Sequence, residues 1–445
     1  MKNQEPFSFR SATLVAVVVG LILAPVRIAV AADDAPDNLT LADAQRIALQ
    51  NHPLIKGSEF DVEAAKQAVQ IAAAPLYPQI AGSAVQAFAG QNTRIGAIGG
   101  LTDPTVIERS AFGLQLSQLI TDFGRTESEE QASQEDLRSE QGRRNFTRTE
   151  ILLGVTQAYY DVLHASALIE VAQDTLKQRQ VLLDQITAMQ KSQLKSTLDV
   201  SIAKQDIDEA QQFMLDADVR QKNAFATLSQ ALGYSDYHAF NLTMPGTVPT
   251  MTEQLDDLLN LALQGNPQLQ TIEAAREAAR HRAEAAGKAF NPEISALGYT
   301  GAVPWSGPAP SINKDYVVGG IVLNVPLYTG GALTAKADQA SAQASSIDQK
   351  VEDQRNQLTR DVRIAYEGAK AAYANIDVTK ALMQNANTTL ELMQSRYRIG
   401  LSSIVDLSQA ELRRTQAAIT NADATYQYFL KRAALNYLIG TVAAQ

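Results

Sequence analysis

A repeated hydrophobic pattern constrains this chain more than any other feature. From residue 151 to residue 176, apolar residues recur in alternating steps of four and three, which is the heptad pattern of helices packed side by side. Adding 207 to each position gives a second series with the same pattern, and this second series continues to Tyr397. The first series is Ile151, Val155, Ala158, Val162, Ala165, Ile169, Ala172 and Leu176, and the second begins with Leu358, Val362, Ala365 and Ala369. The constant offset, from Leu116/Leu323 to Gly233/Gly440, predicts two copies of one unit with no net insertion between them.

Composition excludes several classes of protein. The chain has 445 residues and no cysteine, so it has no disulfides and no thiolate metal sites. Its formal net charge of -10 argues against a nucleic-acid-binding protein that relies on phosphate contacts.

The first residues have the pattern of a secretory signal peptide. Lys2 and Arg10 precede an apolar run over 12–25, and Ala31 closes a stretch of small residues suited to cleavage. We therefore expect residues 1–31 to be a signal peptide and the mature chain to be exported. The alternative is an uncleaved membrane anchor, but the run is shorter than the ~20 residues that a spanning helix needs. No later segment is apolar enough to span a membrane as a helix, so a second membrane segment would consist of strands.

Four short segments, 79–90, 110–120, 293–302 and 316–327, have strand patterns. In 110–120 apolar and polar residues alternate, and in 316–327 one face runs from Val317 to Leu327. Each segment has about the ~9–11 residues with which a tilted strand crosses a bilayer. An ordinary soluble hairpin with one dry face fits the strand pattern about equally well. If the strands do cross a membrane, four cannot close a barrel, whereas three chains would supply twelve strands.

The remaining segments are predicted to be helical. No proline interrupts 123–190 or 331–396, and a helix of ~67 residues rises ~100 Å. Shorter return helices are expected over 197–232 and 403–439. The first repeat then covers 32–233, a linker covers 234–252, and the second repeat covers 253–445, each repeat starting with short helices.

The first part of each long helix has few large apolar residues. It is mostly Ala, Ser, Gln and charged residues over 126–147 and 332–356, so it lacks a dry face of ordinary width. A frayed segment or a solvated single helix would have this composition. The flanking strands favour a third interpretation, a tube wall one helix thick that contacts neighbouring helices sideways through Ala and Ser.

In this order and repeated twice, the motifs resemble those of the TolC family of outer-membrane efflux and secretion channels. They are Leu116-Ser117-Gln118 before Asp122-Phe123-Gly124, Pro326-Leu327-Tyr328 before Gly330-Gly331, Ala158-Tyr159, Ala365-Tyr366, and Gly400-Leu401 with Ile404-Val405-Asp406. The resemblance implies an α+β membrane protein in which a long antiparallel α-helical barrel, a coiled-coil tunnel, is continuous with a transmembrane β-barrel to which each chain gives four strands.

The resemblance also implies where the protein acts and with what. It implies a homotrimer in the outer membrane of a Gram-negative bacterium, embedded in outer-membrane lipid and extending into the periplasm. Its partners would be a periplasmic adaptor (membrane fusion) protein and an inner-membrane transporter, in a tripartite efflux or type I secretion system. It implies no cofactor and no nucleic acid.

Two sets of residues are implied to control flow at the periplasmic end. Asp406 would form an acidic ring on a threefold axis, although an acid near a helix N-terminus more commonly complements the helix dipole. Similar channels have a second acid three residues on, where this chain has Gln409, and an Arg where it has Ser402. Tyr397 and Asp199 match a pair that keeps the family's tip shut; plain packing of Tyr397 on the heptad stripe is the alternative.

The docking tip is implied to lie at the turns between long and return helices. Gly400 and Leu401 match the family's adaptor contact, and Ser403 ends the same turn. Leu194 is the first-half equivalent, although Gln193 stands there in place of the family's glycine. Small and apolar residues at a bare tip suit an interface, and Gly400 also suits the turn itself.

No catalytic or metal-binding pattern emerges from the sequence. His52, His164, His238 and His281 lack the spacing of metal ligands, and we find no phosphate loop and no Ser/His/Asp pattern. We therefore predict a passive trimeric export duct that is not an enzyme. The alternatives are an exported periplasmic coiled-coil scaffold without a pore, an exported enzyme, and an uptake channel, which would need no long periplasmic body.

Overall fold

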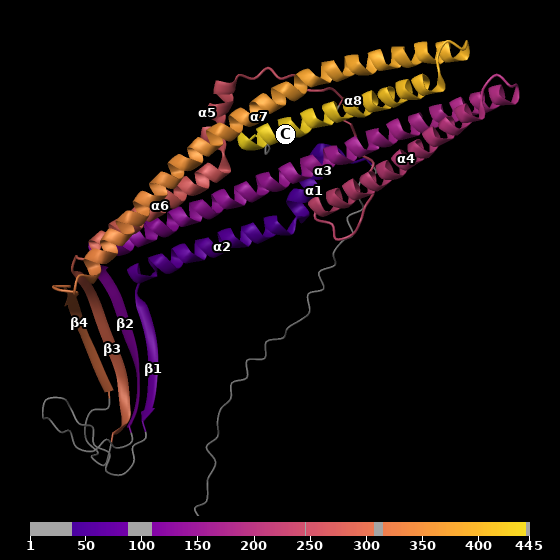
Figure 1. The fold of residues 1–445 in the computed structure, drawn as a ribbon. Coiled ribbons are helices and arrows are strands. Elements are labelled where there is room, and N and C mark those ends of the chain that lie inside the picture. The colour runs from indigo at the N-terminus through magenta and orange to yellow at the C-terminus, as the bar shows by residue number, and fades with distance from the viewer. Residues whose placement is uncertain (1–37, 88–108, 245, 307–314, 442–445) are drawn as a thin grey trace, which may run out of the picture. The chain divides into compact units, whose positions relative to one another are not determined.

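The computed structural model describes residues 38–87, 109–244, 246–306 and 315–441. The predicted signal peptide, 1–31, and residues 88–90 of the predicted strand 79–90 lie outside these residues. In chain order the elements are α1 (Leu41–Asn51), α2 (Pro53–Ala73), the 3-10 helix η1 (Ala74–Leu76), β1 (Gln79–Ala87), β2 (Arg109–Thr121), α3 (Arg125–Lys191), α4 (Thr197–Ala231), α5 (Leu255–Gly265), α6 (Pro267–Lys288), β3 (Glu293–Ser306), β4 (Asp315–Asn324), α7 (Ala332–Arg398) and α8 (Ile404–Leu438). Most of the chain is therefore helical, with a small β region (Figure 1).

The four strands form one antiparallel sheet in the order β1-β2-β3-β4. Because cross-strand partners point to the same side, the register defines two faces. One face carries exposed apolar side chains: Ile80, Phe112, Leu114, Leu116, Val317, Ile321 and Leu323. The other carries small or polar residues such as Ala81, Ser83, Gln115, Ser117 and Ser295, together with Tyr299, Leu297, Val318 and Val322, so it exposes fewer large apolar side chains than the first face.

Two strand predictions are wrong at their ends. We expected the third strand to end at residue 302, but β3 runs on to Ser306. We expected the last strand to run to Leu327, but β4 ends at Asn324, so Val325 and Leu327 lie beyond the ladder. Pro326 explains the difference, because proline has no N–H to donate to a neighbouring strand.

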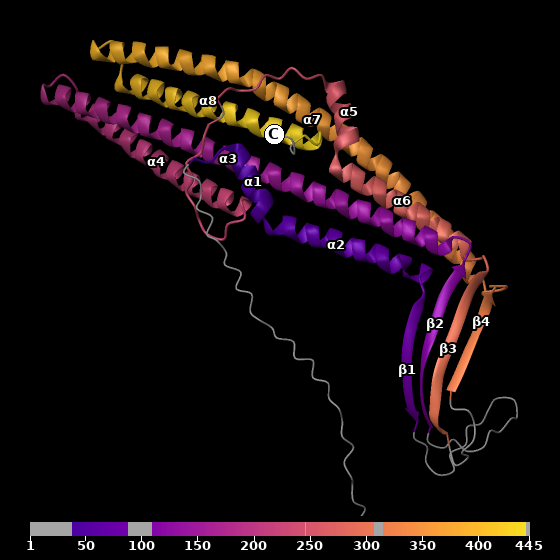
Figure 2. The ribbon, with the colours of Figure 1, turned by 180° about the vertical axis from the view of Figure 1, so that it is seen from behind.

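Next to the sheet, the helices follow the same order as the strands. α2 packs on α3, α3 on α6, and α6 on α7, and the four helices lead away from the same end of the sheet (Figures 1 and 2). Small residues allow close approach: Gly142 of α3 faces Thr271 of α6 so tightly that a Cβ would lie 2.6 Å from Thr271 Oγ1. Ala132 and Ala285 are likewise buried.

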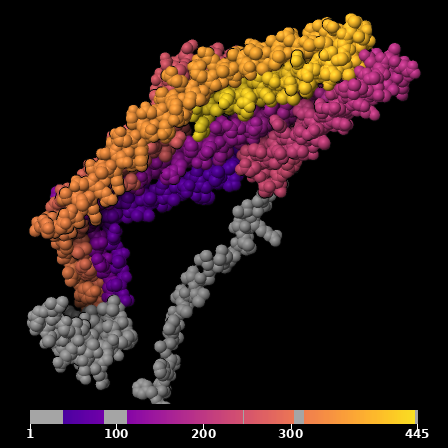
Figure 3. All heavy atoms as spheres, in the orientation of Figure 1, coloured from indigo at the N-terminus to yellow at the C-terminus, as the bar shows by residue number. Residues whose placement is uncertain are grey.

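Farther from the sheet, the order becomes α4-α3-α8-α7. α3 and α4 form one helical hairpin, α7 and α8 form a second, and α3 packs against α8; Figure 3 shows these four helices side by side. α3 and α7 each have 67 residues, and α4 and α8 each have 35. Every heptad position predicted from the sequence is buried or half-buried, so the heptad stripes lie in the contacts between helices.

In each half, a tyrosine of the long helix contacts the backbone oxygen of a segment that lies outside the helices. Tyr159 Oη lies 2.6 Å from Thr243 O and 3.0 Å from Leu39 O, and Tyr366 Oη lies 3.3 Å from Glu253 O. Leu39 also forms a parallel bridge with Leu242. The two Ala-Tyr motifs of the sequence therefore hold the segments that wrap around the helices.

The packed side of α2 does not include all of its apolar residues. Ala64, Ala68 and Ile71 are exposed, whereas Val62 and Ala73 are buried. α2 packs along α3, so its opposite side is left uncovered in a single chain.

Among the described residues, no helix is both long enough and apolar enough to cross a membrane.

Candidate gate and docking tip

Both helical hairpins turn with the same backbone geometry. After α7, Gly400 N donates to Tyr397 O and Leu401 N donates to Arg396 O at 2.8 Å; after α3, Leu194 N donates to Met189 O at 2.9 Å. These are the bonds of a Schellman motif, which needs one residue in the left-handed region. Gly400 takes that place with φ +82°, and Gln193 takes it in the first turn with φ +61°.

Each return helix begins with a capping box. In α4, Asp199 N donates to Ser196 Oγ at 3.2 Å, and Asp199 Oδ2 accepts from Ser196 N at 2.8 Å. In α8, Asp406 N donates to Ser403 Oγ at 3.1 Å, and Asp406 Oδ2 accepts from Ser403 N at 3.0 Å. Asp199 and Asp406 therefore have equivalent local roles, since each satisfies backbone donors that the helix leaves free.

The structure brings Tyr397 and Asp199 together across the two hairpins. Tyr397 Oη donates to Asp199 Oδ1 at 3.4 Å, which leaves Oδ2 for the cap. The tyrosine ring is also buried, in a cluster that includes Leu390 of α7 and Leu407 of α8. The two interpretations from the sequence, a polar tether and plain packing, thus describe one residue that does both.

Lys195 is a further member of this contact that the sequence did not reveal. Its Nζ lies 3.6 Å from the centroid of the Tyr397 ring and donates to Tyr397 O at 3.4 Å. A cation over an aromatic face stabilises the pair by about 0.5–2 kcal/mol. Lys195 lies in the turn, 202 residues before Tyr397 in the chain. Nothing in the sequence around Lys195 indicates that it contacts a tyrosine, so this contact could not be predicted.

Charges at this contact favour an ionised aspartate and a neutral tyrosine. Burial raises the pKa of Tyr397 to about 12, and the Asp199 carboxylate adds to the shift. Burial alone would raise the pKa of Asp199, but hydrogen bonds from Ser196 and the charge of Lys195 outweigh burial and lower it. The tyrosine therefore remains the donor, and the aspartate the acceptor, near neutral pH.

Asp406 and Gln409 lie on the exposed surface of the first turns of α8. Hydrogen bonds from Ser403 lower the pKa of Asp406, so its carboxylate carries a negative charge near neutral pH. In one chain the observed role of Asp406 is helix capping. Ser402 Oγ, at the position where an Arg was expected, is buried and has no hydrogen-bond partner in the described part of the chain.

The two tips expose more apolar side chains than the sequence analysis named. Leu194 is 69% exposed and Leu401 is 63% exposed. Each follows the left-handed residue of its turn, and an apolar side chain at that position often packs back on the preceding helix. Exposed apolar residues beside them are Leu198, Ile399 and Val405. These three residues lie near helix ends and outside the heptad stripe. An apolar residue in such a position is a sequence signal for an exposed apolar side chain at the tip.

Polar contacts join the hairpins farther from the tip. Arg414 Nη2 of α8 donates to Asp174 Oδ2 of α3 at 2.6 Å, and His164 Nε2 of α3 lies 2.6 Å from Asp423 Oδ1 of α8. His52 instead caps α2, with Nδ1 accepting from Leu54 N. In the described residues, no group of three or more His, Asp or Glu side chains is arranged to hold a metal ion.

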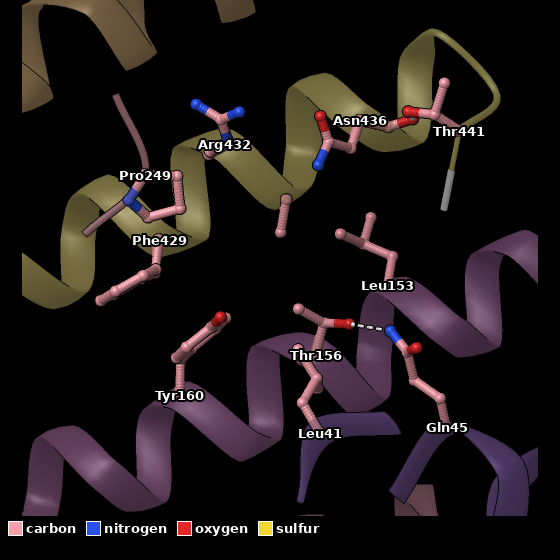
Figure 4. A pocket seen from close by; sticks show the side chains of 11 residues that line it. Leu41, Gln45, Leu153, Thr156, Tyr160, Pro249, Phe429, Arg432, Asn436 and Thr441 are labelled. Atoms are coloured by element: carbon pink, nitrogen blue, oxygen red, sulfur yellow. Dashed lines mark hydrogen bonds between the residues drawn. The ribbon is translucent and has the colours of Figure 1, made fainter. Parts of the chain in front are cut away.

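A small cavity lies where α1 and the linker meet α3 and α8 (Figure 4). Its volume is about 160 Å³, and it lies between Tyr160 and Phe429 on one side and Gln45 and Asn436 on the other. Gln45 Nε2 donates to Thr156 Oγ1 at 3.1 Å across its floor. Ligand pockets usually have volumes of ~300–1,000 Å³, so this cavity is a packing gap at a helix junction.

Comparison with protein families gives one match that covers most of the chain. A model described as outer membrane efflux protein matches residues 45–234 and 258–441. Outer membrane protein TolC of Escherichia coli (strain K12) is 24% identical over 417 residues, which cover 89% of this chain and 81% of that protein. Alkaline protease secretion protein AprF of Pseudomonas aeruginosa is 24% identical over 413 residues, 91% of this chain and 85% of that protein.

Solved structures show the same fold at low sequence identity. The outer membrane protein VceC of Vibrio cholerae has a TM-score of 0.77 at 18% identity, covering 90% of this chain and 96% of that one. The Campylobacter jejuni CmeC outer membrane channel has a TM-score of 0.75 at 18% identity, covering 90% of this chain and 85% of that one.

Proposed function

The chain belongs to the outer membrane efflux protein family, and from that membership we propose that three copies form a passive exit duct across the periplasm and the outer membrane. It is an outer-membrane channel protein of the class that serves efflux and secretion. The family and its curated members are channel proteins, which supports the prediction that the chain is not an enzyme.

The sheet supports the proposal that the strands form part of a shared β-barrel. One face exposes more large apolar side chains than the other, which carries most of the serine and glutamine residues, and this difference agrees in direction with a lipid-facing and a lumen-facing surface. The sheet is open at β1 and at β4, and an open edge in lipid costs several kcal/mol for each unpaired backbone group. β4 of one copy can pair antiparallel with β1 of the next, and three copies then close twelve strands.

Aromatic residues at the strand ends support a membrane boundary there. Every one of the four junctions between strand and helix exposes an aromatic side chain within four residues of the strand: Tyr77, Phe123, Phe290 and Tyr328. Aromatic side chains concentrate at the interface between lipid and water. We infer that this level marks the periplasmic surface of the outer membrane.

Exposed apolar stripes support a ring of copies below the membrane. Ile364, Val378 and Leu392 of α7, with Ile399 just after its last residue, are spaced by multiples of seven and are 62–70% exposed. At the opposite edge, Leu198, Leu215 and Val219 of α4 and Phe60 and Ile71 of α2 are exposed. Because these stripes face away from the chain's own helices, we propose that α7 of one copy packs against α4 and α2 of the next. The equal helix lengths of the two halves support the duplication inferred from the sequence.

We propose the two tips as the gate and the docking surface. Tyr397, Asp199 and Lys195 would hold the hairpins together in the closed state, and three copies of Asp406 would line the narrowing. Gln409 would contribute no charge there. The exposed Leu194, Leu401 and Gly400, with Ser403 at the helix start, would meet a periplasmic adaptor protein, which links the duct to an inner-membrane transporter.

The observation that carries the proposal is the open four-stranded sheet, one face of which exposes more large apolar side chains than the other. Its test is to express the full chain, separate the membranes and insert the purified protein into planar lipid bilayers. We expect outer-membrane fractionation, a trimer, and stepwise conductance. A folded monomer that stays in solution without detergent and forms no pore would refute the proposal and favour a periplasmic scaffold.

A further inference from the structure

Three charged side chains are buried together between the two hairpins of one chain. Arg179 of α3, Asp206 of α4 and Glu411 of α8 are each 5–6% exposed. Arg179 Nη1 donates to the backbone oxygen of Asp206 and lies 3.7 Å from Asp206 Oδ1. Across the seam, Ser408 Oγ of α8 donates to Asp206 Oδ1 at 2.9 Å. The cluster therefore connects the α3–α4 hairpin to the α7–α8 hairpin.

The cluster contains more negative than positive charge. Fully ionised, Arg179 carries one positive charge against two negative charges on Asp206 and Glu411. Glu209, whose side chain is half exposed, adds a third acid 3.5 Å from Arg179 Nη1. Buried charges are stable when they are paired and hydrogen-bonded. A single proton on the Asp206 and Glu411 carboxyl groups would make the buried trio neutral.

The hydrogen bonding of the cluster is also incomplete. Among the described residues, Arg179 Nε, Asp206 Oδ2 and Glu411 Oε2 are buried and have no hydrogen-bond partner. Unsatisfied buried polar atoms of this kind require an explanation. A protonated carboxyl would supply a donor where the ionised cluster has only acceptors on its carboxylates.

We propose that Asp206 and Glu411, beside Arg179, form a proton-binding site that holds the two hairpins of one chain together when occupied. Release of the proton leaves uncompensated negative charge in the seam, so water enters and the hairpins separate more easily. The proton site stands on the packing of a single chain, and its effect on flow rests on the proposed duct function.

The pKa values of both buried carboxyl groups are raised, which favours the protonated form. Burial raises the pKa of Glu411 from its ordinary 4.5 to about 7; Arg179 opposes the shift and the charge of Asp206 adds to it. Burial also raises the pKa of Asp206. The hydrogen bond from Ser408 and the charge of Arg179 oppose this rise, and the charge of Glu209 adds to it. Because the packed state favours the protonated carboxyl, the contact is fully stabilised below pH 4.5 and weakens as the pH rises to about 7. α7 packs against the other side of α8. There the neutral Asn387 accepts a hydrogen bond from Arg414 Nε and adds no charge.

The sequence repeat does not duplicate this site. The positions 207 residues from Arg179, Asp206 and Glu411 are Ala386, Arg413 and Lys204. Arg413 and Lys204 are exposed in the single chain. The acid cluster thus belongs to the seam inside each chain, and pH should loosen that seam while leaving the contacts between copies unchanged.

Hydrogen–deuterium exchange of the full chain in detergent, from pH 5 to pH 8, tests the site without requiring a pore. After correction for intrinsic exchange, we expect peptides over 175–183 and 405–415 to exchange faster as pH rises to 7, by at most about tenfold per pH unit. Glu411→Gln, which is neutral at every pH, should keep the slow exchange seen in acid. The control Glu209→Gln, at a half-exposed acid, should retain the wild-type pH dependence.

Several outcomes would overturn the proposal. Exchange that does not vary with pH in the wild type, or a Glu411→Gln variant with the wild-type pH dependence, would each refute it. If Glu411→Gln does not fold, Asp206→Asn should move the midpoint to lower pH, because it removes a charge that raises the pKa of Glu411; an unchanged midpoint refutes the site. A chain that conducts at no pH would refute the duct function and leave the exchange result standing.

Discussion

Replacing Tyr397 by Phe tests how the hairpins are held at the tip. The substitution removes one hydroxyl, and the ring keeps its burial and its contact with Lys195 Nζ at 3.6 Å. The loss is therefore confined to the hydrogen bond to Asp199 Oδ1, at 3.4 Å. A bond to a charged acceptor contributes ~1.5–3 kcal/mol. This one is longer than the ~2.5–3.0 Å usual for O–H···O bonds, so we expect a smaller loss of about 1 kcal/mol per chain.

In a ring of three chains that opens as a unit, the three losses add. A total of about 3 kcal/mol corresponds to roughly a 150-fold decrease in the ratio of closed to open states. Single-channel recording of the purified protein in planar bilayers measures this ratio directly. Asp199→Ala should be leakier still, because it also removes the acid of the α4 capping box, at a cost of ~0.5–2 kcal/mol.

Ser196→Ala is the matched control for this experiment. It weakens the same cap, since Asp199 N loses its bond to Ser196 Oγ, and it leaves the hydroxyl of Tyr397 in place. If the tether controls the gate, Tyr397→Phe opens the channel more than Ser196→Ala does. Equal open fractions for Tyr397→Phe and the wild type, or a larger effect of Ser196→Ala, would refute the reasoning.

Three further predictions concern stability and can be measured from unfolding in detergent. Gly142→Ala should be about 1–3 kcal/mol less stable than Gly154→Ala, because a Cβ at 142 would lie 2.6 Å from Thr271 Oγ1 whereas a Cβ at 154 meets nothing within 4 Å; equal stabilities would contradict the close packing of α3 on α6. Gln193→Gly should stabilise the chain by about 1 kcal/mol, because residue 193 has φ +61°, and a loss of stability would show that the glutamine side chain is needed in the turn. Tyr159→Phe should cost about 1–2 kcal/mol and speed proteolysis of 234–250, because it removes the hydroxyl that contacts the carbonyls of Thr243 in the linker and of Leu39 beside it; unchanged cleavage would mean that the linker is held by other contacts.

The long helices could be predicted because their signals are local. An uninterrupted heptad stripe fixes which side of α3 and α7 is packed, and turn residues mark where each helix ends. The predicted end of β4 was wrong because the apolar alternation continues through Val325 to Leu327, whereas Pro326 has no N–H to extend the strand.

Contacts between distant segments could not be predicted in the same way. A periodic pattern identifies an apolar side without naming the helix that covers it, and Ile71 of α2 is apolar yet exposed in the single chain. The Tyr397–Asp199 contact came from resemblance to a family, since 198 residues separate the two in the chain. Lys195 and the buried Glu411 had no such guide, because their partners are determined only by which helices become neighbours.

The matching order of strands and helices has a consequence for assembly. β1, α2 and α4 lie at one edge of the chain, and β4 and α7 lie at the other. Two copies related by a twofold axis would set like edges together, so β4 and α7 of one copy would not meet β1, α2 and α4 of the other. In the arrangement we propose, successive copies join head to tail, and such a contact either closes into a rotationally symmetric ring or grows without limit. Curvature in each copy, through the twist of its sheet and the tilt of its helices, would then decide between a finite pore and a filament.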